Sequence, residues 1–181
     1  MTKKRLSYLS DLLDAPSPSG YEDVARKVWR GEMRGVADEV RGDTHGNSIA
    51  VVNGDGRPRV MLAGHIDEIG FQVKYISDEG YISFSTIGGF DVQIIPGRRV
   101  VIHTAGGPVM GVTGKKPIHL MKKEDEKKTP EIHDLWIDTG MGDGKAVKKK
   151  VSVGDPVTYT VGCEKLHDNV YVARGVDDKI G

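Results

Sequence analysis

The chain has 181 residues, and its 26 lysines and arginines are balanced by 26 aspartates and glutamates. Because it carries no net positive charge, general binding to nucleic acid or to an anionic membrane surface is not expected. Cys163 is the single cysteine, which excludes an intrachain disulfide and a cysteine zinc cluster, so any metal would need His, Asp or Glu ligands. No stretch approaches the ~20 apolar residues of a membrane span, and we expect a soluble cytoplasmic protein.

Two helices are predicted at the start of the chain. Four leucines between positions 6 and 13 recur at helical spacing, which predicts an amphipathic helix rather than a signal peptide. A turn containing prolines and a glycine follows. Ser19, with Glu22 three residues later, has the capping-box pattern, which predicts a second helix from about Tyr21 to Met33.

Strands are predicted from residue 38 onward. Residues 38–52 read as two strands around a turn that contains Gly46 and Asn47. Residues 59–65 then have a nearly continuous apolar run, which is typical of a central strand covered on both faces. Two helices before this strand, and a helix start near the end of the chain, predict a layered α/β unit.

The segment from residue 70 to residue 165 is predicted to be all-β. Short strands alternate with Gly-rich turns, as in a small barrel or sandwich. The predicted strands cover residues 71–76, 81–87, 98–104, 107–114, 135–140 and 155–161. A charged segment, 122–134, is predicted to be a solvated loop or short helix without a binding role.

The chain therefore divides into three parts. An α/β part covers residues 1–69, a β insertion covers residues 70–165, and the α/β part resumes at residues 166–181. The chain ends within the first turn of a predicted helix, and an isolated turn is not stable. The sequence is therefore expected to be unfinished.

The strongest candidate site follows the predicted central strand. His65 and Asp67 are two residues apart, so on an extended strand end their side chains point to the same side. His65 can then bind a metal ion while Asp67 holds its second ring nitrogen. The alternative is an ordinary histidine beside acidic residues at the edge of a core.

Asp177 and Asp178 form a second candidate at a predicted strand-to-helix junction. One interpretation is plain capping of the helix, because aspartate is a favoured N-cap residue. The other is a carboxylate that bridges the two metal ions of a hydrolase. Lys179, next in the chain, is expected to pair with a nearby carboxylate.

Several motifs follow one another in a recognisable order. They are APSPSGYE, DTHGNSIA, GHIDEIGF, VTGKKPIHLM, DLWIDTG, VGDPVTY and RGVDDKIG. Together they resemble metallopeptidase family forty-two, the glutamyl and deblocking aminopeptidases, which include self-compartmentalising tetrahedral enzymes. The resemblance implies a three-layer, zinc-aminopeptidase-like α/β catalytic domain, incomplete here, with an inserted small all-β barrel of the PDZ-like kind.

The resemblance also implies roles for individual residues. It makes His65 a ligand of one metal ion, Asp177 the bridge between two ions, and Asp67 a catalytic residue that orients His65. The ions implied are two divalent cations per complete site, zinc or cobalt. Gly64 stands where alanine is common and Lys179 where arginine is usual; neither removes a ligand, although lysine lacks the planar fork of arginine.

The implied activity is that of a metallo-aminopeptidase that acts on peptides as a homo-oligomer, with dimers assembling into a tetrahedral dodecamer. The family's remaining ligands and its general base cannot be placed in this sequence, so the 181-residue chain alone is expected to bind metal weakly and to be inactive. One alternative is a non-catalytic assembly or binding module built on the β insertion. Another is a glycan-cleaving hydrolase, against which the lack of an identifiable acid/base carboxylate pair argues.

Overall fold

The computed structural model describes residues 2–121, 123–124 and 128–180. The prediction for the charged segment 122–134 therefore lies partly outside the described residues. The chain forms two compact units, one of Met1–Glu68 with Val161–Gly181 and the other of Ile69–Thr160. Within the described ranges, no helix combines the length and the apolar character that crossing a bilayer requires.

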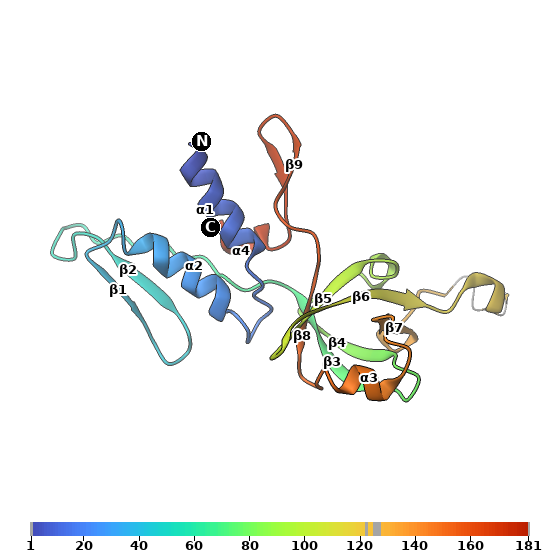
Figure 1. Ribbon diagram of the computed structural model, residues 1–181. Helices are drawn as coiled ribbons and strands as arrows, with labels where there is room; N and C mark the ends of the chain where they lie inside the picture. The colour runs from blue at the N-terminus through green and yellow to red at the C-terminus, as the bar shows by residue number, and fades with distance from the viewer. Residues whose placement is uncertain (1, 122, 125–127, 181) are drawn as a thin grey trace. The chain divides into compact units, whose positions relative to one another are not determined.

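The unit Ile69–Thr160 is a closed six-stranded barrel (Figure 1). Its strands are β3 (Gly70–Ile76), β4 (Ile82–Ile87), β5 (Arg99–Thr104), β6 (Gly107–Lys115), β7 (Leu135–Asp138) and β8 (Pro156–Tyr159). Around the barrel they follow the order β3-β4-β7-β6-β5-β8, and neighbours run antiparallel. The six predicted strands and the predicted barrel are confirmed.

Alternating burial explains why these sequences close into a barrel. Along β6, Val109, Gly111 and Thr113 face inward while the residues between them are exposed. A Cβ atom at Gly111 would lie 2.5 Å from the side chain of Ile137, so this position needs glycine. The short helices of the unit are η1 (Val92–Ile94), η2 (Ile118–Leu120), η3 (Ile132–Asp134) and α3 (Gly144–Lys148).

The other unit begins with two packed helices, α1 (Lys3–Asp14) and α2 (Asp23–Met33). Leu12, Ala15 and Ala25 form its small apolar core. The second helix starts at Asp23, and the predicted capping box at Ser19 is wrong, because the N-cap is Glu22 without a side-chain hydrogen bond. The Ser19 hydroxyl donates instead to the carboxylate of Asp67.

Two small antiparallel sheets belong to the same unit. Strands β1 (Glu39–Gly42) and β2 (Ser48–Val51) form the predicted pair around the turn at Gly46. Strands β9 (Glu164–His167) and β10 (Val170–Val172) form the second pair. The short helix α4 (Val176–Lys179) follows and lies beside α1 (Figure 1).

The predicted central strand at residues 59–65 is not formed. These residues have no regular structure, and the side chains of Val60, Met61 and Leu62 are 78%, 87% and 93% exposed. A strand requires a neighbour that accepts and donates its backbone hydrogen bonds. Within the described residues β1 pairs with β2 and β9 with β10, and residues 59–65 pair with neither sheet.

Candidate metal centre

His65 lies between two carboxylates. Its Nδ1 atom is 3.0 Å from Oδ1 of Asp67 and 3.2 Å from the backbone oxygen of the same residue. Its Nε2 atom is 3.3 Å from Oδ1 of Asp177. The structure thus brings together all three residues that the sequence singled out. The side chains of His65 and Asp177 are open to solvent, 54% and 96% exposed.

The contacts of His65 determine where its proton lies. A backbone carbonyl oxygen can only accept a hydrogen bond, so Nδ1, which faces the carbonyl of Asp67, carries hydrogen. In the neutral ring, Nε2 then carries a lone pair that faces a carboxylate oxygen of Asp177. When the ring is protonated, Nε2 donates to this carboxylate; in the neutral ring the two facing atoms can instead both bind a metal ion.

The pKa of His65 agrees with this electrostatic arrangement. Desolvation lowers the pKa, but the charge of Asp67 and hydrogen bonds to Asp67 and Asp177 outweigh it, and the pKa lies above its ordinary value of 6.5. The raised pKa means that the surroundings favour the protonated ring.

The spacing fits two ligands of one metal ion. Two ligand atoms at 2.0–2.2 Å from a tetrahedral zinc ion lie about 3.4 Å apart. The observed 3.3 Å between Nε2 of His65 and Oδ1 of Asp177 is close to that separation. Among the described residues, no group of three or more His, Cys, Asp or Glu side chains is placed to hold a metal ion.

Ser19 is a site residue that the sequence interpretation missed. Its hydroxyl donates to Oδ2 of Asp67, while Oδ1 of the same carboxylate contacts His65. Both oxygens of Asp67 are therefore held. The available signal was that Ser19 lies in the APSPSGYE motif, but the capping pattern with Glu22 gave a competing local explanation.

The turn that carries Ser19 is bound directly to the segment that carries His65. The backbone N–H of Glu68 donates to the carbonyl of Ser17 at 2.8 Å, and the Ser17 hydroxyl donates to the carbonyl of Ile66 at 2.9 Å. Because these bonds flank position 67 on the same stretch of backbone, they set Ser19 against Asp67.

Asp177 does not cap its helix. The N-cap of α4 is Gly175, in the left-handed conformation, and the backbone of Asp177 is extended, with φ −93° and ψ 107°. The capping interpretation is therefore wrong, and the Asp177 carboxylate lies beside His65 instead.

A buried ion pair adjoins the site. Nζ of Lys179 is 3.4 Å from Oε1 of Glu68, and the two side chains are 0% and 1% exposed. Desolvation lowers the pKa of Lys179, and the charge of Glu68 opposes this shift. Arg174 also approaches, with Nε 3.2 Å from Oε2 of Glu68. The prediction that Lys179 pairs with a nearby carboxylate is confirmed.

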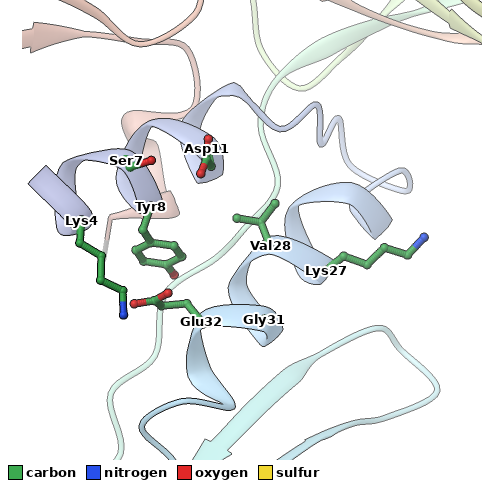
Figure 2. Close-up of a pocket in the computed structure, with 8 residues that line it drawn as sticks. All are labelled: Lys4, Ser7, Tyr8, Asp11, Lys27, Val28, Gly31 and Glu32. Atoms are coloured by element: carbon green, nitrogen blue, oxygen red, sulfur yellow. The ribbon is translucent and has the colours of Figure 1, made fainter.

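A separate groove of about 400 Å³ lies between α1 and α2 (Figure 2). It is lined by Lys4, Ser7, Tyr8, Asp11, Lys27, Val28, Gly31 and Glu32. Burial raises the pKa of Tyr8, and the charge of Glu32 adds to the effect. Because its lining includes neither His65 nor Asp177, this groove is not the candidate metal centre.

Comparisons with known proteins agree with the motifs. A lysyl aminopeptidase of Pyrococcus furiosus is 27% identical over 175 residues, which are 95% of this chain and 50% of that protein. A TET aminopeptidase from a marine sediment Thaumarchaeota archaeon superimposes with a TM-score of 0.87 and 36% identity, covering 91% of this chain and 47% of the other. The chain spans about half the length of the curated relatives that it matches.

A third relative adds information on assembly. The TET1 peptidase of Pyrococcus horikoshii, which can assemble into a tetrahedron or a large octahedral shell, matches with a TM-score of 0.84 and 30% identity over 96% of this chain and 52% of its own. The family model described as M42 glutamyl aminopeptidase matches residues 46–181, which include His65, Asp67 and Asp177. The chain therefore belongs to the M42 glutamyl aminopeptidase family.

Proposed function

We propose that His65 and Asp177 bind one divalent metal ion together, that Asp177 also reaches a second ion, and that Asp67 orients His65 and supports catalysis. The observation that carries this proposal is the 3.3 Å approach of two acceptor atoms, Nε2 of His65 and Oδ1 of Asp177. Zinc or cobalt suits this set, since both accept imidazole and carboxylate ligands.

The residues of this chain have distinct tasks in that centre. The chemistry supplied by bound divalent ions is Lewis acidity toward a peptide carbonyl and toward water. Asp67 accepts the Nδ1 hydrogen of His65, which keeps the Nε2 lone pair directed at the site. Ser19 holds the other oxygen of Asp67 and so limits rotation of that carboxylate.

We infer that the substrates of the intact protein are peptides with a free N-terminus. The family description and the lysyl aminopeptidase relative support this substrate class. A larger, three-layer catalytic domain is part of the proposal. The exposed apolar side chains of Val60, Met61 and Leu62 support it, because such a domain would cover them.

We further propose that the intact protein is a homo-oligomer and that its PDZ-like barrel contributes subunit contacts. The assembly of the TET1 relative supports this. A non-catalytic assembly module is the second candidate function. It is favoured by the barrel's own complete core, in which Phe71, Ile82, Ile102 and Ile137 are 0% exposed. If the intact protein releases amino acids from peptides and a chelator abolishes this release, the protein is a metal-dependent aminopeptidase and not a non-catalytic assembly module.

The ligand assignment is tested in the intact protein that contains this chain. His65→Ala and Asp177→Ala should each lower the bound zinc or cobalt and the release of an amino-acyl chromophore. His167→Ala is the matched control, because His167 is also exposed and also lies 3.0 Å from an aspartate, Asp168, but outside the site. Undiminished metal in both site variants would refute the ligand roles.

The 181-residue chain alone should behave differently from an intact enzyme. A catalytic zinc ion normally has three protein ligands, and the described residues offer two at this point. We therefore expect weak metal binding and little turnover from this chain, measured by equilibrium dialysis and by the same chromogenic assay.

A further inference from the structure

The buried pair of Glu68 and Lys179 lies directly behind the candidate metal centre. Glu68 follows Asp67 in the chain, and Lys179 follows Asp177 by two positions. The 3.4 Å contact between their charged groups therefore joins the two segments that carry the proposed ligands. The two segments are distant in sequence, so this contact is a direct tie between them.

The pair is also tied to the turn that carries Ser19. Nζ of Lys179 donates to the carbonyl of Ala15 at 2.8 Å. Oε1 of Glu68 accepts the backbone N–H of Ser17 at 2.9 Å. Three segments, 15–19, 65–68 and 174–179, thus converge on two buried charges, and each segment contributes a residue to the site or to its support.

Gly175 shows how closely this convergence is packed. A Cβ atom at this position would lie 2.9 Å from Cε of Lys179 and 3.1 Å from Oε2 of Glu68. A side chain at position 175 would therefore crowd both members of the ion pair, and glycine leaves the space that they occupy.

The proposed ligands have no comparable packing of their own. Asp177 is 96% exposed and His65 is 54% exposed, so apolar contacts do not fix the distance between them. A buried ion pair is by itself weak evidence for stability, because desolvation of both charges opposes their attraction. Because this pair lies between the two segments that carry the proposed ligands, it can fix the position of one segment relative to the other.

We infer that the Glu68–Lys179 pair is a positioning pair, which holds His65 and Asp177 at the separation that a shared metal ion requires. The inference rests on the proposed metal centre. Neither side chain touches the ion; each acts through the backbone of the segment that it anchors. Removing one partner should therefore weaken metal binding without removing a ligand.

The test uses cobalt(II) as the probe in the intact protein that contains this chain. Lys179→Met keeps the length of the side chain and removes its charge, and Glu68→Gln is close in shape to the native residue. Supporting residues outside the coordination shell typically contribute tenfold to a hundredfold in metal affinity. We expect a loss of about tenfold or more in cobalt affinity and a changed visible spectrum of the bound cobalt. Lys179→Arg, which keeps the charge and N–H donors, should restore most of both.

A control separates positioning from general stability. The hydroxyl of Thr113, buried in the barrel, donates to the carbonyl of Ile95 at 2.5 Å, far along the chain from any proposed ligand. Thr113→Val should lower the unfolding midpoint and leave cobalt affinity and spectrum unchanged. If Lys179→Met does not fold, Glu68→Gln carries the test alone.

His65→Ala, measured in the same titration, separates the two proposals. The positioning inference is overturned if Glu68→Gln, and Lys179→Met where it folds, keep the native cobalt affinity and spectrum. If His65→Ala loses cobalt in the same experiment, the proposed metal centre still stands. If His65→Ala itself keeps full cobalt binding, the metal centre fails first.

Discussion

The barrel and the helical unit cover their apolar side chains in different ways. In the barrel, closure gives each strand neighbours within the unit, and Phe71, Ile102 and Ile137 are completely buried. The helical unit has a small core, and one of its apolar segments, residues 60–62, is exposed. The barrel unit thus has one large core, although Met110, Ile118 and Leu120 stay exposed, whereas the helical unit has a small core and an exposed apolar segment.

The candidate site belongs to the helical unit, and this has a consequence for its precision. A site on a packed sheet would be held by the apolar core beneath it. Here His65 and Asp177 are exposed, and their segments are anchored both by the buried charges of Glu68 and Lys179 and by Ile66, which packs against the small apolar core. The geometry of the site should therefore respond to changes in these buried charges as well as to changes in the core.

The largest expected effect contrasts one apolar residue from each unit. Phe71 is 0% exposed and stacks on Phe90 with ring centroids 4.5 Å apart, so Phe71→Ala should lower the free energy of unfolding of the barrel by about 3–5 kcal/mol. Leu62→Ala in the 181-residue chain should change stability by less than about 0.5 kcal/mol, because Leu62 is 93% exposed.

The two tryptophans allow each unit to be followed separately, since Trp29 lies in α2 and Trp136 in β7. Denaturant unfolding of single-tryptophan variants, monitored by fluorescence, measures both effects. A loss of unfolding free energy above about 1 kcal/mol for Leu62→Ala would mean that residues 60–62 are covered, and the contrast between the two units would disappear. This threshold is about twice the usual scatter of surface substitutions.

Two glycines give the next largest contrast. Gly140 in the barrel unit and Gly175 in the helical unit have φ values of 69° and 70°, so alanine at either position meets the left-handed penalty of about 1–2 kcal/mol. At Gly140 a Cβ atom finds nothing within 4 Å, whereas at Gly175 it crowds Lys179. Gly175→Ala should therefore cost about 1–3 kcal/mol more than Gly140→Ala, by the same fluorescence measurement. Equal losses of unfolding free energy in the two variants would show that the Lys179 side chain moves aside at no cost.

Local patterns predicted the barrel well and the helical unit less well. Strands such as β6 and β7 alternate more buried and more exposed residues, and this period is visible in the sequence without knowledge of the neighbouring strands. The apolar run at 59–65 is nearly continuous rather than alternating, and a strand also needs a partner, whose presence a sequence pattern does not state. The capping-box prediction at Ser19 was wrong for a related reason, because a helix N-terminus nearby and a carboxylate distant in sequence are both possible partners of the same hydroxyl.

The candidate site was predicted in part. Residue types and spacing made His65 and Asp67 a plausible pair and marked Asp177 and Asp178 as a second candidate, and the family resemblance selected Asp177. The contact between His65 and Asp177 depends on long-range packing, which no local period encodes. The burial of Glu68 and Lys179 was equally hidden, because charged residues beside a motif are usually solvated and nothing in the sequence marks which ones lose their water.

Metal binding should stabilise one unit only. Cobalt at ten times its dissociation constant should raise the free energy of unfolding by about 1.4 kcal/mol, if the unfolded chain does not bind it. The increase should be seen with Trp29, whose unit holds His65 and Asp177, and should be absent with Trp136 in the barrel. EDTA should reverse it. An equal increase from both probes would place the bound ion elsewhere, or would show that the units unfold together.

The smallest effect concerns the proton that competes with the metal. In the metal-free chain the pKa of His65, measured by NMR titration of its ring protons, should lie above 6.5, and Asp67→Asn should lower it. Since the folded state holds the proton more tightly than the unfolded chain, this stabilising contribution is complete below the unfolded pKa and is lost as the pH rises through the folded pKa.

A pKa below 6.5 would mean that desolvation outweighs the carboxylates, contrary to the open and charged surroundings of the ring. Because the same carboxylates raise the proton affinity of His65 and belong to the proposed metal centre, Asp177→Asn should lower both the pKa of His65 and the affinity for cobalt. If Asp177→Asn lowered the pKa of His65 but not the cobalt affinity, or the reverse, the proton and the metal ion would bind at different places. Nε2 of His65 and Oδ1 of Asp177 would then not be the shared site of both.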